Sequence, residues 1–383
     1  SALSVGGDVS FNSALLVVKD TSLNSALSVG GDVSFNSALS VGDDVSFNSA
    51  LSVGGDVSFN SALLVVKDTS LNSALSVGGD VSLNAGLDVR GNLTSVNDIL
   101  VNGITIGTGS GDISTNTVFG IGALTSNTDG RGNIATGYQA LTSNTEGRGN
   151  IANGYQALHK NETGNDNVAN GYQALHKNTG FNNVATGSFA LYTNTSGNYN
   201  NATGYKALYS NTTGSNNTAT GDVSLKNNLT GTNNTATGEA ALHYNTGGNY
   251  NTANGTRALY KNTTGSNNVA NGFQALYDNS GGDYNVANGT SALFSNTTGE
   301  GNVANGYAAL YSNVDGSNNI AMGHLALYNN TTGSGNIAIG SNSGYTNTDG
   351  SYNTFLGTDT DVLSSDLSNS TALGYNAKIT ASH

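Results

Sequence analysis

The sequence predicts an all-β protein, an elongated β-solenoid fibre built from two kinds of repeat. Two observations carry this prediction: residues 1–96 repeat every 12 residues, and residues 118–357 repeat every 17 residues. A fixed short period is typical of solenoids, in which one repeat cannot bury its apolar face alone. The chain also lacks proline, which would remove a ladder hydrogen bond. We therefore expect one elongated body rather than the two or three globular domains that 383 residues could hold.

The 12-residue repeat predicts a shaft of short strands over residues 1–96. Its first copy reads Ser-Ala-Leu-Ser-Val-Gly-Gly-Asp-Val-Ser-Phe-Asn. Two alternating apolar pairs, Leu3 with Val5 and Val9 with Phe11, are separated by Gly-Gly-Asp. This pattern predicts two strands and a tight turn in each repeat.

A junction at residues 97–117 separates the two repeat systems. Within it, Ile99–Gly107 predicts a strand–turn–strand unit. Residues 358–383 follow the second repeat system and are expected to form a terminal rung and an exit to a further C-terminal region. The chain begins inside a repeat and without methionine, so we expect it to be part of a longer protein.

The 17-residue repeat has the approximate consensus Gly-Tyr-x-Ala-Leu-Tyr-x-Asn-Thr-Thr-Gly-Ser-x-Asn-x-Ala-x. We call its first residue the marker glycine. Strand alternation would place the alanine two residues before this glycine, the glycine and the leucine four residues after it on one side. Asn211–Gly214 is expected to be an exposed loop, with Asn and Gly accepting positive φ. The predicted structural core includes Leu208, Leu225, Leu242, Leu259, Ala219, Ala236, Gly221 and Gly238.

One step of the second system is short. Gly171 and Gly187 are 16 residues apart, and the missing residue falls in the loop at 178–181. Loop deletions cost little when the strands stay in phase, so we expect Ala185 to keep the orientation of Ala169.

The thin apolar core of one repeat favours a homotrimer. A single chain would bury only a few apolar residues per repeat, whereas three chains around one axis would bury a second face and protect the strand edges. A single-chain β-helix is the alternative.

Several short stretches carry a family resemblance. Asn336–Gly340 and its repeats resemble the head repeats of trimeric autotransporter adhesins, although those repeats are shorter. Val101–Gly107 and Asn369–Ala377 resemble segments of phage and other viral tail-fibre proteins. The resemblance implies left-handed parallel β-rolls assembled as trimers, in proteins where an endosialidase-type intramolecular chaperone often follows.

Composition excludes several classes of function. Only 10% of the residues are charged, the net charge is −13, and lysine and arginine do not cluster, so nucleic acid is not an expected partner. No apolar run is long enough to insert into a membrane. No nucleophile–base pair, phosphate loop or paired carboxylates stand out, so we expect no enzyme activity, no catalytic residues and no cofactor.

Two groups of side chains have the residue types that can bind metal ions. His159 and His176 lie one period apart, but repeat duplication explains the pair better than metal binding. Asp359, Asp361 and Asp366 lack the spacing of a calcium loop and are expected to be solvated turn residues. We predict no metal ligands.

Three further patterns have a functional and a structural interpretation. Sequons such as Asn211-Thr-Thr and Asn262-Thr-Thr could accept glycans, but turn propensity explains them. Thr218–Thr220 and Thr235–Thr237 resemble ice-binding rows, yet the pattern does not continue along the repeat. Aromatic residues just after the leucine could stack on sugars, but packing on the neighbouring repeat is favoured. These aromatic residues are Tyr192, Tyr209, Tyr260, Tyr277, Phe294, Tyr311 and Tyr328.

The expected function is that of a non-enzymatic shaft of a virus or phage tail fibre, used in host attachment. Expected partners are two further copies of the chain, adjoining fibre or virion proteins, and a host-surface glycan or protein. The expected location is extracellular, on the virion surface. A bacterial cell-surface trimeric adhesin stalk is the alternative, and an ice-binding or polysaccharide-degrading β-solenoid is the third interpretation.

Overall fold

The computed structural model describes residues 95, 97–111 and 113–381. The predicted 12-residue shaft therefore lies almost entirely outside the described residues. The described residues form twenty short strands and no helix. The strands are β1 Ile99–Val101, β2 Ile104–Gly107, β3 Thr117–Gly120, β4 Ile134–Thr136, β5 Ile151–Asn153, β6 Val168–Asn170, β7 Val184–Thr186, β8 Asn201–Thr203, β9 Thr218–Thr220, β10 Thr235–Thr237, β11 Thr252–Asn254, β12 Val269–Asn271, β13 Val286–Asn288, β14 Val303–Asn305, β15 Ile320–Met322, β16 Ile337–Ile339, β17 Thr354–Leu356, β18 Asp361–Val362, β19 Thr371–Leu373 and β20 Lys378–Ile379.

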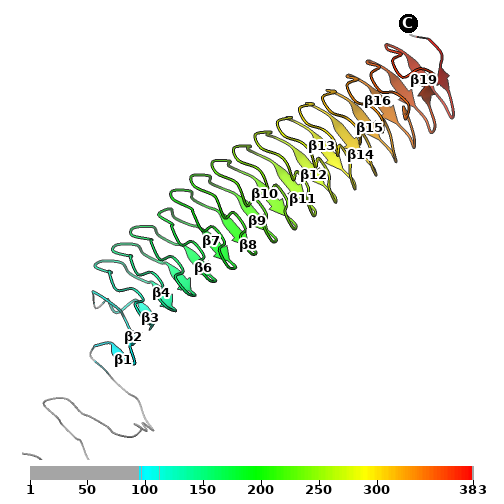
Figure 1. The fold of residues 1–383 in the computed structure, drawn as a ribbon. Helices are drawn as coiled ribbons and strands as arrows, with labels where there is room; N and C mark the ends of the chain where they lie inside the picture. The colour runs from blue at the N-terminus through cyan, green and yellow to red at the C-terminus, as the bar shows by residue number, and fades with distance from the viewer. Residues whose placement is uncertain (1–94, 96, 112, 382–383) are drawn as a thin grey trace, which may run out of the picture. The chain divides into compact units, whose positions relative to one another are not determined.

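A β-solenoid is the dominant architecture, as the sequence predicts. From β3 to β17, and then β19, each strand pairs in parallel with the corresponding strand one repeat later. Each repeat is therefore one rung, and successive rungs stack along a single axis (Figure 1). A second, two-stranded sheet of β18 and β20 forms beside the last rungs.

The junction contains the strand–turn–strand unit that the sequence predicts. β1 and β2 pair antiparallel, with Ile99 opposite Ile106. β2 then pairs antiparallel with β3. The carboxylate of Asp98 accepts hydrogen bonds from the backbone N–H groups of Thr108 and Gly109, at 2.6 and 2.9 Å. These contacts fix the chain where it enters the first rung.

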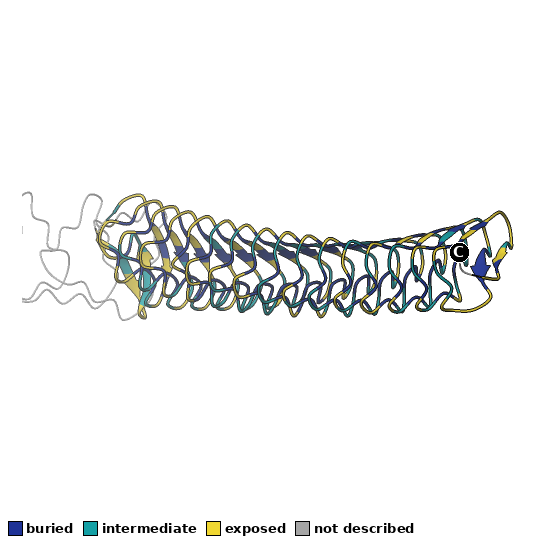
Figure 2. Ribbon diagram, turned by 90° about the horizontal axis from the view of Figure 1, so that it is seen from above, coloured by how far each residue is buried: buried dark blue, intermediate teal, exposed yellow. Residues whose placement is uncertain are grey.

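The interior of a rung is formed by leucine, alanine and asparagine. In β4–β16 and β19 the central alanine faces inward, as Ala219 and Ala236 do, and its two neighbours face outward, whereas Phe355 takes the central position in β17. Buried residues recur in every rung along the stack (Figure 2). The predicted core leucines Leu208, Leu225, Leu242 and Leu259 are all fully buried.

The leucine reaches the interior for a reason other than strand alternation. Each strand is only three residues long, and the backbone turns a corner after it. Leu208 and Leu225 have φ of 52° and 48°, in the left-handed region that non-glycine residues rarely adopt. Thr212 and its neighbours in the Asn211–Gly214 loop do not have positive φ. The prediction that Asn and Gly of this loop adopt left-handed backbone is therefore wrong.

The marker glycines lie at a corner of the rung and are half-buried, rather than in the interior as predicted. Gly221 has φ of +128°, and a Cβ there would lie 2.6 Å from the carbonyl oxygen of Gly238. Glycine is therefore required both by its backbone conformation and by the close approach of the next rung.

Two columns of buried asparagine complete the core. One column lies seven residues after the marker glycine and includes Asn211, whose Nδ2 donates to Asn194 Oδ1 at 2.7 Å and to Gly214 O at 2.9 Å. The other column lies four residues before the marker glycine and includes Asn217. The Asn211 amide nitrogen donates to the rung before it and to its own rung, whereas the Asn217 amide nitrogen donates to the rung before it and to Gly231 in the rung after it. Because these amides are paired, polar side chains fill the core without unsatisfied groups. This corrects the interpretation of these asparagines as exposed turn residues.

The closed core also corrects the reasoning that favoured a trimer. Leucine, alanine and asparagine of one chain fill the rungs, and Phe355 does so where Gly344 stands in place of the leucine, so no second chain is needed to close them. An assembly through the described rungs would therefore use their outer faces.

The 16-residue step keeps its register, as predicted. Ala185 pairs with Ala169 and is fully buried. The lost residue falls between Asn178 and Gly180, where Asn178 Nδ2 still donates to Gly180 O at 2.8 Å. The asparagine column therefore continues through the shortened loop.

Replacing Leu225 with alanine should lower the free energy of unfolding by about 2–5 kcal/mol, because it opens a cavity in the continuous leucine column. Thr212, expected to be exposed, is half-buried, and its Oγ1 donates to Leu229 O at 2.8 Å. Thr212→Ala should therefore cost about 1 kcal/mol. The adjacent, exposed Thr213 is the control, with an expected change within about 0.5 kcal/mol. Denaturant unfolding of the three variants checks this order, and equal losses for Leu225→Ala and Thr213→Ala would contradict it.

Candidate functional site

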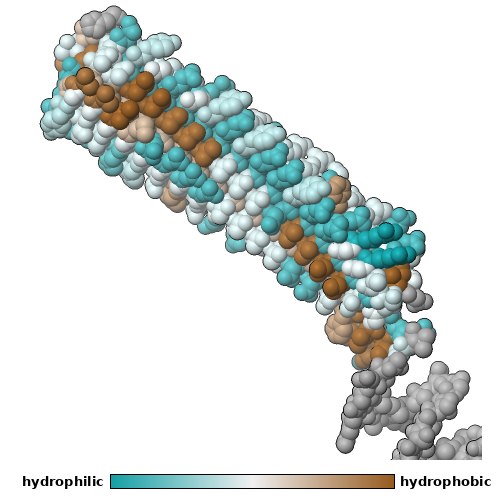
Figure 3. Space-filling view, turned by 180° about the vertical axis from the view of Figure 1, so that it is seen from behind, coloured by the Kyte–Doolittle hydropathy of each residue, from teal (hydrophilic) through white to brown (hydrophobic). Residues whose placement is uncertain are grey.

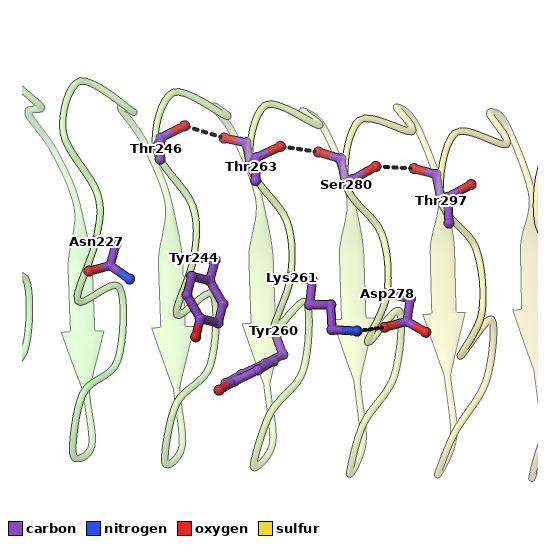
Figure 4. A pocket seen from close by; sticks show the side chains of 9 residues that line it. All are labelled: Asn227, Tyr244, Thr246, Tyr260, Lys261, Thr263, Asp278, Ser280 and Thr297. Atoms are coloured by element: carbon purple, nitrogen blue, oxygen red, sulfur yellow. Dashed lines mark hydrogen bonds and ion pairs between the residues drawn. The ribbon is translucent and has the colours of Figure 1, made fainter.

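A shallow, open groove on the outside of five consecutive rungs is the candidate ligand site. It has a volume of about 840 Å³ and runs between two rows of side chains (Figure 4). One row comes from the sixth residue after each marker glycine, and the other from the eighth. Because the residue between them is the buried asparagine, both rows point outward on either side of it.

The upper row is formed by Thr246, Thr263, Ser280 and Thr297. Each hydroxyl donates a hydrogen bond to the backbone carbonyl of the next rung, at 2.8–3.1 Å. Since the hydroxyl hydrogens are used within the protein, the oxygens that face the groove remain free to accept hydrogen bonds.

The lower row carries an ion pair. Lys261 Nζ lies 2.7 Å from Asp278 Oδ1. A hydrogen bond with Asp278 raises the pKa of Lys261 above its usual value, so the amine is charged across the physiological range. Lys261 Nζ also lies 5.4 Å from the centre of the Tyr277 ring.

Tyr244 forms the wall at one end of the groove. Its ring is perpendicular to the Tyr260 ring, with an interplanar angle of 86° and centroids 5.2 Å apart. It also packs edge-on against His243, at 4.7 Å. Burial, and then a side-chain hydrogen bond with Tyr244, raise the pKa of Tyr260, while burial lowers the pKa of His243. At neutral pH the aromatic end of the groove is therefore uncharged.

The predicted aromatic residues stack on their neighbours in adjacent rungs, which confirms the packing interpretation. In one ladder, centroids of successive rings are 5.0–5.4 Å apart and the planes are nearly parallel. The ring faces cover one another, so they are not free to stack on a sugar. This ladder consists of His243, Tyr260, Tyr277, Phe294, Tyr311, Tyr328 and Tyr345, and a separate ladder consists of His159, His176, Tyr192 and Tyr209.

The histidine pair belongs to the second ladder. The rings of His159 and His176 are stacked with centroids 5.1 Å apart. Among the described residues, no group of three histidine or carboxylate side chains could hold a metal ion. Burial, followed by repulsion from His159, Lys160 and Lys177, lowers the pKa of His176 to about 4.

Acid should therefore destabilise the solenoid through His176. Between pH 6.5 and 4 the unfolded chain binds a proton at this residue that the folded chain does not, so stability falls as pH falls through this range. Tyrosine occupies the next position of the ladder, at Tyr192. Replacing His176 with tyrosine should therefore remove the part of the acid-dependent loss of stability that His176 causes. Melting temperatures of both proteins from pH 7.5 to 4 measure the effect. Parallel pH profiles would rule out a contribution from His176.

The three C-terminal aspartates do not converge on one point. Asp361 is buried rather than solvated, and its carboxylate accepts from Thr346 N at 3.1 Å and from Val362 N at 2.9 Å. Asp359 accepts from an asparagine of the preceding rung, and the exposed Asp366 accepts from a nearby serine. Their oxygens satisfy local donors of the fold.

The sequon asparagines are part of the core. Asn211 and Asn262 are fully buried, and each Nδ2 donates to two oxygens inside the solenoid. A glycan on either nitrogen is incompatible with this fold.

The paired threonine rows are confined to two rungs. Within β3–β17 and β19, only β9 and β10 carry threonine at both outward positions, Thr218 with Thr220 and Thr235 with Thr237. The adjacent strands carry asparagine in one of the two positions.

Sequence reasoning did not identify the groove. The signal was present: in three consecutive rungs the sixth residue after the marker glycine is Tyr244, Lys261 and Asp278, where nine of the other rungs between Gly120 and Gly340 have serine, threonine or asparagine. Only the stacking of the rungs shows that these side chains face one another across a common surface.

Among the described residues, no helix has the length and apolarity needed to span a bilayer. Comparison of the sequence with models of known protein families, and with curated proteins, gives no match.

Proposed function

We propose that this chain is the non-enzymatic shaft of a virus or phage fibre that serves in host attachment, exposed on the virion surface. The observation that carries the proposal is the uninterrupted stack of rungs from β3 to β19, in which the leucine, alanine and asparagine interior recurs in most rungs (Figure 1). Such a stack resists bending and sets a fixed length, which is what a spacer between a particle and its host requires. The resemblance of Val101–Gly107 and Asn369–Ala377 to tail-fibre segments agrees with it.

We propose further that three copies assemble through the outer face of the strands. No charged residue occupies the outward positions of β3–β17 and β19, although the chain as a whole carries a net charge of −13. Apolar side chains gather on the solenoid surface towards its C-terminal end (Figure 3). This band includes the exposed side chains of Ile320, Met322, Ile337, Ile339, Leu356 and Leu373. An uncharged, partly apolar face lets acidic chains approach one another.

Mass measurement by light scattering should give three chains for the purified protein. The solenoid should appear in electron micrographs as a straight segment of roughly 70 Å, since about fifteen rungs stack at ~4.8 Å. Replacing Ile337 and Ile339 with lysine should shift the mass to that of one chain without loss of β-structure. A stable wild-type monomer would contradict the trimer.

Immunogold labelling separates the two candidate functions. Antibodies against residues 118–357 should label fibrous appendages of virus particles. Label on the surface of bacterial cells would instead support a trimeric adhesin stalk, which the resemblance of Asn336–Gly340 to adhesin head repeats favours.

A further inference from the structure

We propose that the groove between Tyr244 and Thr297 binds a neutral, linear oligosaccharide that lies along the solenoid axis. This deepens the attachment function proposed above and rests on it for its biological role. The argument itself depends only on the side chains that form the groove (Figure 4).

The groove exists because the repeat is broken at one surface position. Most rungs have a small polar residue six positions after the marker glycine, as Ser210 and Ser295 do. Three successive rungs instead have Tyr244, Lys261 and Asp278, which project further and raise a wall beside the hydroxyl row. The core beneath these three rungs is the same as elsewhere, so the change is confined to the surface.

Tyr244 offers an aromatic surface that the ladder does not cover. Its side chain is 44% exposed, whereas His243 beside it is buried in the ladder. Tyr244 meets Tyr260 edge-on rather than in a parallel stack. An open tyrosine ring at the end of a groove is suited to packing against the C–H face of a pyranose ring.

The opposite wall provides a regular row of acceptors. The oxygens of Thr246, Thr263 and Ser280, whose hydrogens are donated to the protein, recur once per rung, at a spacing of ~4.8 Å. This spacing is close to the length of one sugar unit in an extended chain, so successive sugar hydroxyls can donate to successive rungs. Leu229 and Val314 replace the hydroxyl residue on either side, which limits the row to four rungs.

The wall formed by the lower row carries both charges of one ion pair and no excess charge. Asp278 can accept hydrogen bonds from vicinal hydroxyls, and Lys261 can donate to a ring or hydroxyl oxygen. Because the pair is neutral as a whole, the groove favours an uncharged ligand over an anionic one. The volume of about 840 Å³ is within the usual range for a ligand site and accommodates several sugar rings.

The test uses the full chain and an array of linear neutral tetrasaccharides of glucose, galactose, mannose and N-acetylglucosamine. We expect retention of at least one array member, followed by titration of that sugar. Tyr244→Asn and Asp278→Ser, which restore residues found at this position in other rungs, should each weaken binding at least tenfold. Tyr205→Ser is the matched control, since Tyr205 is 45% exposed but lies outside the groove, and it should bind as the wild type does.

Three results would overturn the proposal: no array member retained, equal affinity of the wild type and Tyr244→Asn, or binding of an extended peptide in place of the sugars. Circular dichroism of each variant shows whether the rungs remain folded. If the wild-type protein binds no sugar but antibodies label virus fibres, the sugar-binding proposal is rejected and the fibre function is retained. If the wild-type protein binds a sugar but antibodies do not label virus fibres, the fibre function is rejected and the sugar-binding proposal is retained.

Discussion

Replacing Asn211 with aspartate should destabilise the solenoid by about 3–5 kcal/mol, although the side chain keeps its size. The substitution removes two donors and places a carboxylate oxygen opposite Asn194 Oδ1 and Gly214 O, which now lie 2.7 and 2.9 Å from the amide nitrogen. The site is fully buried, so the charge has no solvent to compensate it. Thermal and denaturant unfolding should show the loss.

The destabilisation caused by Asn211→Asp should be smaller at acid pH, because the protonated carboxyl group regains one hydrogen-bond donor. Asn201→Thr is the control, because Asn201 faces outward on β8 and the next strand carries Thr218 at this position. Its expected change is within about 0.5 kcal/mol. Similar losses for the buried and the outward substitution would mean that the asparagine column does not stabilise the fold.

Two adjacent glycines should respond very differently to the addition of one methyl group. A Cβ on Gly248 would overlap the carbonyl oxygen of Gly265 and the side chain of Asn245, and the backbone of the neighbouring rung cannot move without disturbing the stack. Gly248→Ala should therefore cost at least ~3 kcal/mol. A Cβ on Gly247 has Thr230 Oγ1, at 3.6 Å, as its nearest neighbour, so Gly247→Ala should be nearly neutral.

The melting temperatures of Gly247→Ala and Gly248→Ala measure the difference between the two sites. Both substitutions lie in the same turn and reduce the conformational entropy of the unfolded chain equally, so that contribution cancels. Equal melting temperatures would show that rung spacing in this turn is looser than the structure indicates.

The architecture of the described residues can be predicted from the sequence alone. The 17-residue period predicted the stack, because residues that recur at a fixed interval must meet their own copies in neighbouring rungs. The recurrence of leucine and alanine predicted which apolar side chains are buried, and Ala185 shows that the period holds across the shortened loop. These features depend on which residues repeat, and a single sequence contains that information.

The roles of the polar residues could not be predicted from the sequence, because they depend on contacts between stacked rungs. Asparagine is common in turns, so the sequence favoured an exposed role for Asn211. In the structure its amide nitrogen donates to Asn194 in the rung before it and to Gly214 in its own turn, and its amide oxygen accepts from Asn228 in the rung after it. The left-handed φ of Leu208 likewise follows from closing a 17-residue rung around its core. The groove beside Tyr244 depends on contacts between rungs at positions where the repeat varies. The period of the sequence specifies the features that all rungs share. A site arises from residues that differ between rungs, and which of these residues come into contact is decided by how the rungs stack.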